Sequence, residues 1–481
     1  MSDTSGPDFL FHWEGGSTEW DQLRVVSLRV EDALSSPYEV KLVLRAKTTE
    51  DEIDPETMVG QLATLRIATL SEPAVRCLHG LIIEASEIGA TRNGMLYEVI
   101  LAPPVIRAAH RVGCRIFLEK STREIIEAVL TTDPKMKPDD PEFEAPDSIT
   151  DAFEPPTESF AFRVADPARI EDKKTRPYCV QYNESNLQFV ARLLAEEGIA
   201  YHFEHHAKAI VMVLSDSDEG RTKLEPFDPV APGALGRQLD QIRLGGRMRA
   251  TKFRLTDYNW TKPKLDMKAE AKADGDESLA VDHYPGLYPD EPKQGELLVK
   301  ARLERLQTEA RFAEIDTGCR LLGAGTVFAV AHPTPRYEGE YLAVRVILTG
   351  HVLGELGAGE GVPAVRASHQ TSAPSARASS ARVAAPGTRP RSRSIGPPCR
   401  SSRASSVLRR QWWRPSLRRR APRSTSEAPR ATRTAACASS FTGIWKPSAT
   451  TRSLPLAGCG SRKPLQGQAV ARFRTRVSAP R

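Results

Sequence analysis

Three histidines and one glutamate lie close together in the chain, and these residue types could bind a metal ion. They are His202, Glu204, His205 and His206. Neutral imidazoles and a carboxylate are common ligands of zinc. In an extended strand, however, successive side chains point to opposite faces, so His205 and His206 cannot converge on one ion. The HExxH helix pattern of zinc proteases is also absent from the sequence. We therefore expect a solvated strand end here and no metal ligands.

Cysteine could supply a nucleophile, but its thiol then needs a nearby base and a lowered pKa. Cys179 follows Tyr178 and precedes a strand-like run, and the sequence indicates no base beside it. We expect Cys179 to be a small buried apolar side chain, and we expect the same of Cys114 and Cys319. The seven cysteines include no CxxC pair, so neither a zinc site nor a disulfide framework is indicated. Folding in a reducing compartment fits this pattern.

Gly323 and Gly325 form a Gly-Ala-Gly sequence between two expected strands. A phosphate-binding loop would need GxxxxGK[ST], or GxGxxG at the start of a helix. A turn is therefore the better interpretation. We expect no catalytic residue, no cofactor-binding residue and no metal site in this chain.

Charge divides the chain into two unlike parts. Residues 1–360 contain 42 Lys and Arg against 60 Asp and Glu, a net charge of −18, whereas residues 361–481 contain 25 against one, a net charge of +24. The second part has no Asp, no Tyr and two Ile. Such a composition cannot bury enough apolar surface to offset the entropy of ordering the chain. We expect residues 356–481 to be a disordered tail rich in Arg, Ser, Pro and Ala.

The tail also interleaves Arg with Trp, a pattern that can bind single-stranded nucleic acid through charge and stacking. The residues are Arg409, Arg410, Arg414, Arg418, Arg419 and Arg420, with Trp412 and Trp413 between them. The same charge would attract RNA or an anionic membrane without specificity. We expect nonspecific adhesion of this kind and no specific nucleic-acid partner.

The N-terminal residues 1–16 have neither a basic segment nor an apolar segment of the kind found in signal peptides. No stretch approaches 18 consecutive apolar residues, so no membrane span is predicted. If the protein leaves the cell, we expect it to use a route other than the usual export signal.

Alternating apolar and polar residues predict antiparallel strands over much of residues 1–355. In residues 38–45, for example, Tyr38, Val40, Leu42 and Leu44 face one way, and Glu39, Lys41 and Arg45 face the other. The Asn-Gly pair at residues 93–94 is typical of a tight hairpin. Further strands are expected at 62–68, 78–84, 96–101, 199–204, 209–214, 251–258, 326–331 and 340–349.

Three amphipathic helices are predicted among these strands. The first begins after Ser121, with Glu124 completing a capping box, and the second begins after Ser185, with Gln188 in the same role. Gly198 stands where a C-terminal glycine cap belongs. The third helix covers about 295–310, and its Glu and Lys residues form either a solvated face or a contact with a neighbouring subunit.

Residues 131–175 are rich in Asp, Glu and Pro, and we expect a poorly ordered excursion there. The whole pattern predicts a β-dominated α+β fold with a few inserted helices.

Several ordered motifs resemble the VgrG proteins, which form the spike of the bacterial type VI secretion system and are similar to phage tail hubs. The clearest is RPYCVQYNESNLQFVARLLAEEGIAYHFEH at 176–205. The others, in family order, are SSPYEVKLVL at 35–44, VGQLATLRI at 59–67, CRIFLEKSTREIIEAVL at 114–130, HYPGLYPDEPKQGELLVKARLERLQTEA at 283–310 and CRLLGAGTVFAVAHPTPRYEGEYLAVRV at 319–346.

The resemblance implies that residues 8–350 form the family's N-terminal tube module. Such a module is expected to build tube-like barrels, to form a homotrimer that caps the hexameric tube protein Hcp, and to bind effectors or tip proteins. It implies a structural protein rather than an enzyme, assembled in the cytoplasm and delivered outside the cell by the apparatus. The alternatives are a plain phage tail hub, a nucleic-acid-binding protein acting through its tail, and a hydrolase effector.

In the family this module is followed by an OB-like barrel and a needle, and the tail resembles neither as written. The possible codons of Ala431–Pro447, taken in a shifted frame, are compatible with DEYGRVRKQFHWDLEA, which is similar to the barrel segment of the family. The same shift over Ala457–Ala479 permits WVRVSQA followed by PHPRIG. We hypothesise a frameshift between about residues 350 and 375, so that 356–481 is an out-of-frame remnant and trimerisation is impaired.

Overall fold

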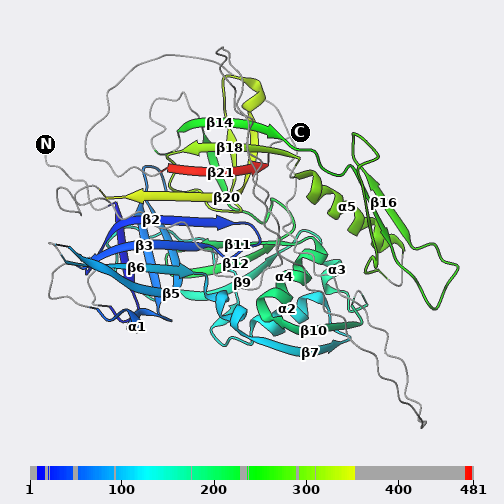
Figure 1. Cartoon of the computed structure of the whole chain (residues 1–481), viewed down its shortest axis with the longest axis horizontal. Coiled ribbons are helices and arrows are strands. Elements are labelled where there is room, and N and C mark those ends of the chain that lie inside the picture. Colours follow the sequence, from blue (N-terminus) through cyan, green and yellow to red (C-terminus); the bar gives the residue numbers. More distant parts are fainter. Residues whose placement is uncertain are drawn as a thin grey trace, which may run out of the picture. The chain divides into compact units, whose positions relative to one another are not determined.

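The computed structural model describes residues 8–352 and 472–478, with gaps at 17–19, 21, 47–52, 92–93, 175, 228–235, 237, 289–291 and 309. Strands dominate this part of the chain, and a few helices lie between them (Figure 1). The prediction of a β-dominated α+β fold is therefore confirmed. Most of the predicted tail lies outside the described residues.

The largest sheet has twelve strands drawn from both ends of the chain. Ten of them follow one another in hydrogen-bonded order: β1 (Phe9–Trp13), β4 (Leu62–Ala68), β5 (Val75–Thr91), β6 (Gly94–Ala102), β3 (Glu39–Ala46), β2 (Leu23–Ala33), β20 (Gly339–His351), β21 (Arg472–Ser478), β18 (Arg311–Thr317) and β14 (Leu239–Gly246). Two more join beside β20: β19 (Val327–Val330) and β13 (Lys223–Phe227). Figure 1 shows β14, β18, β21, β20, β2 and β3 side by side.

Period-2 alternation predicted β3, β4, β6, β19, β20 and part of β5, but it misjudged one face. In β3 the odd-numbered Lys41 and Arg45 were predicted to face away from the core, and both are buried. Their neighbour Val43 packs with Val26 and Leu96 in a small second apolar cluster on that face. The strand is therefore covered on both sides rather than half-buried.

A second sheet has four strands, and two of them lie within residues 131–175, where an excursion was predicted. Its order is β11 (Ala200–His205), β12 (Ala209–Ser215), β9 (Thr157–Arg163) and β8 (Met136–Pro138). The prediction of a poorly ordered segment at 131–175 is therefore wrong for β9, which pairs in parallel with β12 along its whole length. The loop before β9 is also held in place, because Arg66 donates to the carbonyl oxygens of Ile149 and Asp151.

Two smaller sheets complete the strands. A two-stranded ribbon joins β7 (Val112–Leu118) to β10 (Tyr178–Ser185). A three-stranded sheet has the order β16 (Lys268–Lys272), β15 (Lys252–Thr256) and β17 (Ala280–His283), and it packs against a long helix.

The predicted helices form, and their caps are the ones the sequence indicates. In α2 (Thr122–Leu130), Ser121 and Glu124 make the reciprocal capping box, and in α4 (Asn186–Glu197), Ser185 and Gln188 do the same. Gly198 ends α4 with φ of +77°, which glycine adopts at no steric cost. The remaining helices are α1 (Pro55–Met58), α3 (Ala168–Glu171), α5 (Pro292–Thr308) and two 3-10 turns, η1 (Pro104–His110) and η2 (Pro335–Tyr337).

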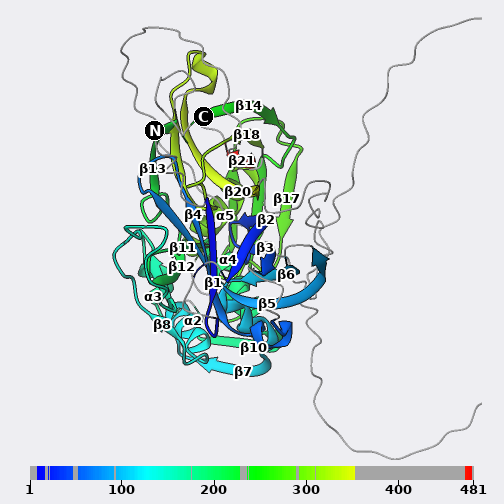
Figure 2. The same ribbon diagram turned by 90° about the vertical axis from the view of Figure 1, so that its left-hand side faces the viewer.

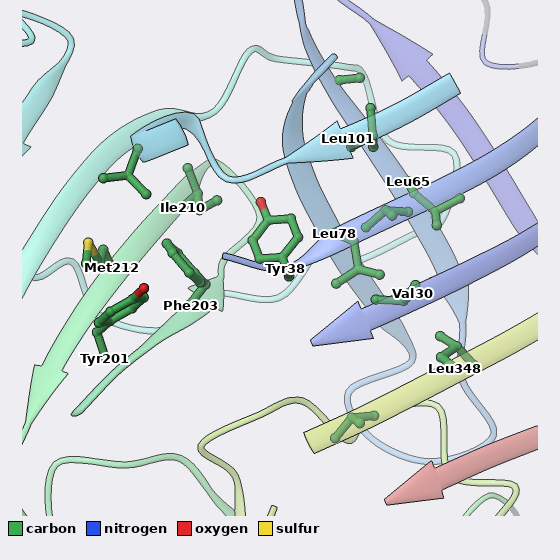
Figure 3. Packing of buried hydrophobic residues seen from close by; sticks show 14 of the residues in the cluster. Val30, Tyr38, Leu65, Leu78, Leu101, Tyr201, Phe203, Ile210, Met212 and Leu348 are labelled. Carbon is green, nitrogen blue, oxygen red and sulfur yellow. The ribbon is translucent and has the colours of Figure 1, made fainter. Parts of the chain in front are cut away.

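One apolar cluster joins the two larger sheets. Figure 3 shows Val30, Leu65, Leu78 and Leu101 from the twelve-stranded sheet together with Phe203, Ile210 and Met212 from the four-stranded one. Tyr38 lies where they meet, with its ring 5.2 Å from that of Phe203 and its hydroxyl donating to the carbonyl oxygen of His79. Burial of these side chains is the main force that holds the two sheets together.

Candidate functional site

The histidine cluster lies at the end of β11, with His206 directly after the strand, and alternation divides the cluster between two faces. His202, Glu204 and His206 have even numbers and share one face, whereas His205 lies on the other with Tyr201 and Phe203. His202, Glu204 and His206 are all buried. The prediction of a solvated strand end is therefore wrong, although the prediction that His205 and His206 face opposite ways is confirmed by their different neighbours.

Distant segments cover the even face of β11. The backbone of residues 142–144 lies along its end, where His206 Nδ1 is 3.2 Å from the carbonyl oxygen of Glu142 and the Phe143 ring packs edge-on against the His206 ring. The turn at Gly325 closes the other end. This glycine has φ of +87°, and a Cβ there would lie 2.5 Å from His202 Cγ. Both contacts come from loops that no local sequence pattern links to β11.

Glu204 is the centre of a buried ionic network on this face. Its oxygens lie 3.4 Å from His202 Nε2 and 2.9 Å from a guanidinium nitrogen of Arg163, and it accepts a hydrogen bond of 2.8 Å from Thr222 Oγ1. Burial would raise the pKa of Glu204. The hydrogen bonds from His202 and His206 and the charge of Arg163 outweigh burial and hold the pKa well below its usual range. Glu204 is therefore a buried carboxylate anion.

This network neutralises the carboxylate with protein groups. Arg163 also bonds Asp140 at 2.7 Å, so its guanidinium bridges two acids. A cation already occupies the position beside Glu204 that a metal ion would need. Among the described residues, no group of three or more His, Cys, Asp or Glu side chains is arranged to hold a metal ion.

The other face of β11 meets a histidine that the sequence did not single out. The backbone N–H of His79 donates to His205 Nδ1 at 3.1 Å. His79 Nδ1 lies 2.8 Å from Thr64 Oγ1, and its Nε2 lies 2.6 Å from the carbonyl oxygen of His206. Burial lowers the pKa of His79 to about 4 and lowers that of His205 well below its usual value. Both are therefore neutral imidazoles at neutral pH.

A second buried pair ties the turn at 323–325 to the large sheet. The backbone N–H of Ala324 donates to Asp32 Oδ2 at 2.7 Å, and Arg76 donates to the carbonyl oxygens of Arg320 and Leu322. Burial raises the pKa of Asp32, although the Ala324 hydrogen bond and the Arg76 charge oppose that effect. The interpretation of the glycines as a turn is confirmed.

The cysteine predictions are confirmed at two positions and wrong at the third. Cys179 and Cys319 are buried, and burial raises the pKa of the Cys179 thiol, which makes it a poor nucleophile. Cys114 is exposed on β7, where its thiol lies 3.3 Å from Asn183 Oδ1. The reason is that the β7–β10 ribbon is covered on one face only.

The open face of this ribbon carries a row of exposed apolar side chains, with exposed fractions between 60% and 73%. They are Val112, Ile116, Leu118, Tyr178 and Tyr182. The opposite face packs on α4, where the rings of Phe117 and Phe189 stack with centroids 5.8 Å apart. Figures 1 and 2 both show β7 and β10 beside α2. An exposed apolar surface of this kind is typical of a protein contact.

The third predicted helix is α5, and its apolar face packs on the three-stranded sheet through Leu298, Val299 and Leu303. Lys300 and Glu296 on its outer side are exposed, as a solvated face requires. No helix among the described residues is long and apolar enough to cross a membrane. The Arg and Trp groups at 409–420 lie outside the described residues.

The model of the phage tail baseplate hub (GPD) family matches residues 31–353. The type VI secretion system spike protein VgrG4b of Pseudomonas aeruginosa is 28% identical over 340 residues, which are 68% of this chain and 38% of that protein. The actin cross-linking toxin VgrG1 of Vibrio cholerae is 25% identical over 318 residues, 64% of this chain and 26% of that protein. This chain thus spans well under half the length of either relative.

Among solved structures, the Escherichia coli c3393 protein, described as a component of the type VI secretion system, is similar with a TM-score of 0.49 and 17% sequence identity. The match covers 71% of this chain and 73% of that one.

Proposed function

We propose, from the premise that this chain belongs to the phage tail baseplate hub (GPD) family, that it is a structural component of a type VI secretion tip. In this proposal residues 8–350 form the trimeric base that caps the Hcp tube. The protein performs no chemistry of its own and acts by binding copies of itself, the tube below and effectors or tip proteins above. It is assembled in the cytoplasm and carried outside the cell with the tip.

The family match over residues 31–353 carries this proposal. It spans almost all the described strands, and the relative VgrG4b is itself named as a spike protein. The exposed apolar row on the β7–β10 ribbon gives independent support, because a protein that works by assembly needs surfaces that partners can cover.

The buried ionic network supports a structural role rather than catalysis. Glu204 is held between Arg163, Thr222 and His202, so the carboxylate already has protein partners. The toxin relative matches this chain over only 26% of its own length, so its name supports no toxin activity here.

We extend the proposal to the tail: residues 356–481 are the out-of-frame remnant of an OB-like barrel. Nucleotide sequencing across codons 345–380 tests this directly. If no other frame continues through the barrel segment, the frameshift proposal is wrong, whereas the assignment of residues 8–350 stands.

The assembly itself is tested by comparing the full chain with a version whose reading frame has been restored. Light scattering after size exclusion should give a trimer for the restored chain and a smaller species for the chain as written. The restored trimer should bind hexameric Hcp from the same bacterium. A restored chain that stays monomeric, or that does not bind Hcp, contradicts the proposed function.

A phage tail hub is the second candidate, and the description of the matched family favours it. The neighbouring genes distinguish the two: tail genes for a phage hub, and tube and sheath genes of a secretion system for a tip protein. None of the comparisons favours the nucleic-acid-binding alternative.

A further inference from the structure

Trp260 is a large apolar side chain that stays open to water, with an exposed fraction of 79%. It lies in the loop of residues 257–267, which joins β15 to β16 in the three-stranded sheet. Tyr258, two residues before it, is 55% exposed. Covering such side chains releases hydrophobic free energy, and tryptophan is among the residue types that contribute most to protein interfaces. This loop therefore has the side chains of a contact surface.

The same loop is rigidly built, so its shape is fixed before any partner binds. Asn259 is buried, and its Oδ1 accepts hydrogen bonds from the Thr261 N–H at 2.9 Å, the Thr261 hydroxyl at 2.6 Å and the Lys262 N–H at 2.9 Å. At the base of the loop, the Asp257 N–H donates to the carbonyl oxygen of Met267 at 2.9 Å. A loop that is already ordered loses little conformational entropy on binding.

The outer part of the loop, residues 258–265, carries positive charge, and we call it the Trp260 tip. Lys262 and Lys264 lie in it, are exposed, and form no ion pair within the described part of the chain. The two acids of the loop lie at its base, where Asp257 accepts the Tyr288 N–H and Asp266 accepts the Lys268 N–H. The tip thus combines exposed aromatic rings with a net positive charge.

A second loop, residues 139–147, has the opposite charge, and we call it the Phe143 loop. It contains no basic residue and five exposed acids, which are Asp139, Asp140, Glu142, Glu144 and Asp147. Only Asp140 has an ion-pair partner among the described residues, at 2.7 Å from Arg163. Phe143 lies in the middle of these acids and is 59% exposed.

The Phe143 loop is also held in place, because its backbone is bonded on both sides of the aromatic ring. The carbonyl oxygen of Glu142 lies 3.2 Å from His206 Nδ1, and the carbonyl oxygen of Glu144 accepts the Ala207 N–H at 2.6 Å. The Phe143 ring lies edge-on to the His206 ring, with centroids 5.3 Å apart. The carboxylates are therefore presented to solvent from a fixed backbone.

We infer that the Trp260 tip of one copy of this chain docks on the Phe143 loop of the next copy. The inference rests on the proposed function, because it assigns a contact within the proposed trimer. A threefold ring is closed by head-to-tail contacts, so each copy must present two unlike surfaces that fit one another. The tip and the loop are such a pair, since they carry opposite charge and each contains an exposed aromatic ring.

The partner is a second copy because a single chain leaves both surfaces open. Trp260 and Phe143 are 79% and 59% exposed, so neither covers the other within one molecule. Between copies, Lys262 and Lys264 would lie against Glu142 and Glu144, and opposite charges across an interface favour encounter and fix the register. The two aromatic rings would pack together at the centre of that contact.

Photo-crosslinking in the full chain tests the contact. The variant Trp260→p-benzoylphenylalanine keeps an aromatic group at the tip, and it is mixed with isotope-labelled unsubstituted chain. Mass spectrometry should find crosslinks from the unlabelled tip to labelled residues 139–147. The control is Leu297→p-benzoylphenylalanine, at a position on α5 that is 58% exposed, and it should not capture this loop. Capture of a different segment by the tip, or of no labelled chain, overturns the inference.

Charge reversal tests whether the acids of the loop select the tip. In the chain with p-benzoylphenylalanine at position 260, Lys262→Glu with Lys264→Glu should lower the crosslinking yield at least about tenfold, because like charges then face each other. Adding Glu142→Lys and Glu144→Lys to the same chain should restore the yield, since every contact again joins opposite charges. A yield that does not fall, or that falls and is not restored, contradicts the docking.

A matched control separates local contacts from net charge. Lys174→Glu with Lys300→Glu makes the same change in net charge at two other exposed positions and should leave the yield within about twofold of the parent. An equal loss in this control would mean that overall charge, rather than the tip, drives the association.

The chain with its reading frame restored distinguishes this inference from the proposed function. On dilution, the restored trimer carrying Lys262→Glu and Lys264→Glu should dissociate at a concentration at least about tenfold higher than the restored parent. If both dissociate at the same concentration, the docking is wrong and the proposed function stands. If the restored parent forms no trimer, the proposed function fails, and the crosslinks in the chain as written still decide whether the two loops meet.

Discussion

Polar side chains are usually exposed and apolar ones buried, but the β11 cluster and the β7–β10 ribbon both depart from this rule, in opposite ways. On β11, two histidines and a glutamate are buried, whereas on the ribbon, valine, isoleucine, leucine and tyrosine are exposed. The difference lies in their partners. The β11 groups find ions and hydrogen-bond donors from other segments, and the apolar row on the ribbon faces solvent. The first region is held by contacts within the protein, and the second leaves a surface for other chains.

At neutral pH, the largest loss of stability is expected when Glu204 loses its charge. Glu204→Gln leaves the half-buried Arg163 with Asp140 as its one remaining acidic partner, and we expect the free energy of unfolding to fall by about 2 kcal/mol. Urea unfolding of the full chain, followed by tryptophan fluorescence, measures the change. Glu338→Gln, a substitution at an exposed position, should have almost no effect. A loss for Glu204→Gln no larger than that of this control would mean that the network contributes nothing.

Acid should weaken the β11 region through the protonation of its buried histidines. The pKa of His79 falls from 6.5 to about 4 on burial. Between those values the unfolded chain binds a proton that the folded chain does not, so stability is complete above about pH 6.5 and falls as the pH falls toward 4, by up to roughly 3 kcal/mol. His205, whose pKa is lowered in the same way, adds to this slope.

Unfolding measured at several pH values checks that expectation. His79→Gln cannot bind the proton and should make the pH dependence shallower between those limits. An unchanged slope in that variant would show that His79 does not titrate as expected.

A smaller loss of stability is expected for a change beneath the covered face of the ribbon. Ser185 ends β10 and caps α4, the helix beneath the ribbon. Ser185→Ala removes the hydrogen bond to the Gln188 N–H and should cost about 1 kcal/mol. Ser185→Asp, which retains a capping oxygen, should recover most of it. If Ala and Asp behave alike, the cap is not what holds α4 beneath β10.

The smallest effect on stability is expected on the open face. Ile116→Thr keeps a β-branched side chain in β7 and should change the free energy of unfolding by less than about 0.5 kcal/mol. Phe117→Ala, one residue away on the covered face, should cost several times more because it removes the stack on Phe189. A large loss for Ile116→Thr would show that this side chain is already covered.

Local sequence signals determined α2, α4 and α5 and part of the strands. The capping boxes at Ser121 and Ser185 and the glycine cap at Gly198 act within one helical turn, so the sequence alone placed α2 and α4. Alternation placed β3, β4, β11, β12 and β20 to within a residue or two, because each strand carries its own pattern. The ordered family motifs indicated the hub family before any contact was known.

The tertiary structure alone decided which polar groups are buried and what they meet. Arg163 and Thr222 reach Glu204 from other strands and loops, and His79 meets β11 from more than a hundred residues away. No short window of sequence contains both partners of such a contact. The same reason explains why β9 was missed inside an acidic, proline-rich stretch: its place is fixed by pairing with β12, about fifty residues further along the chain.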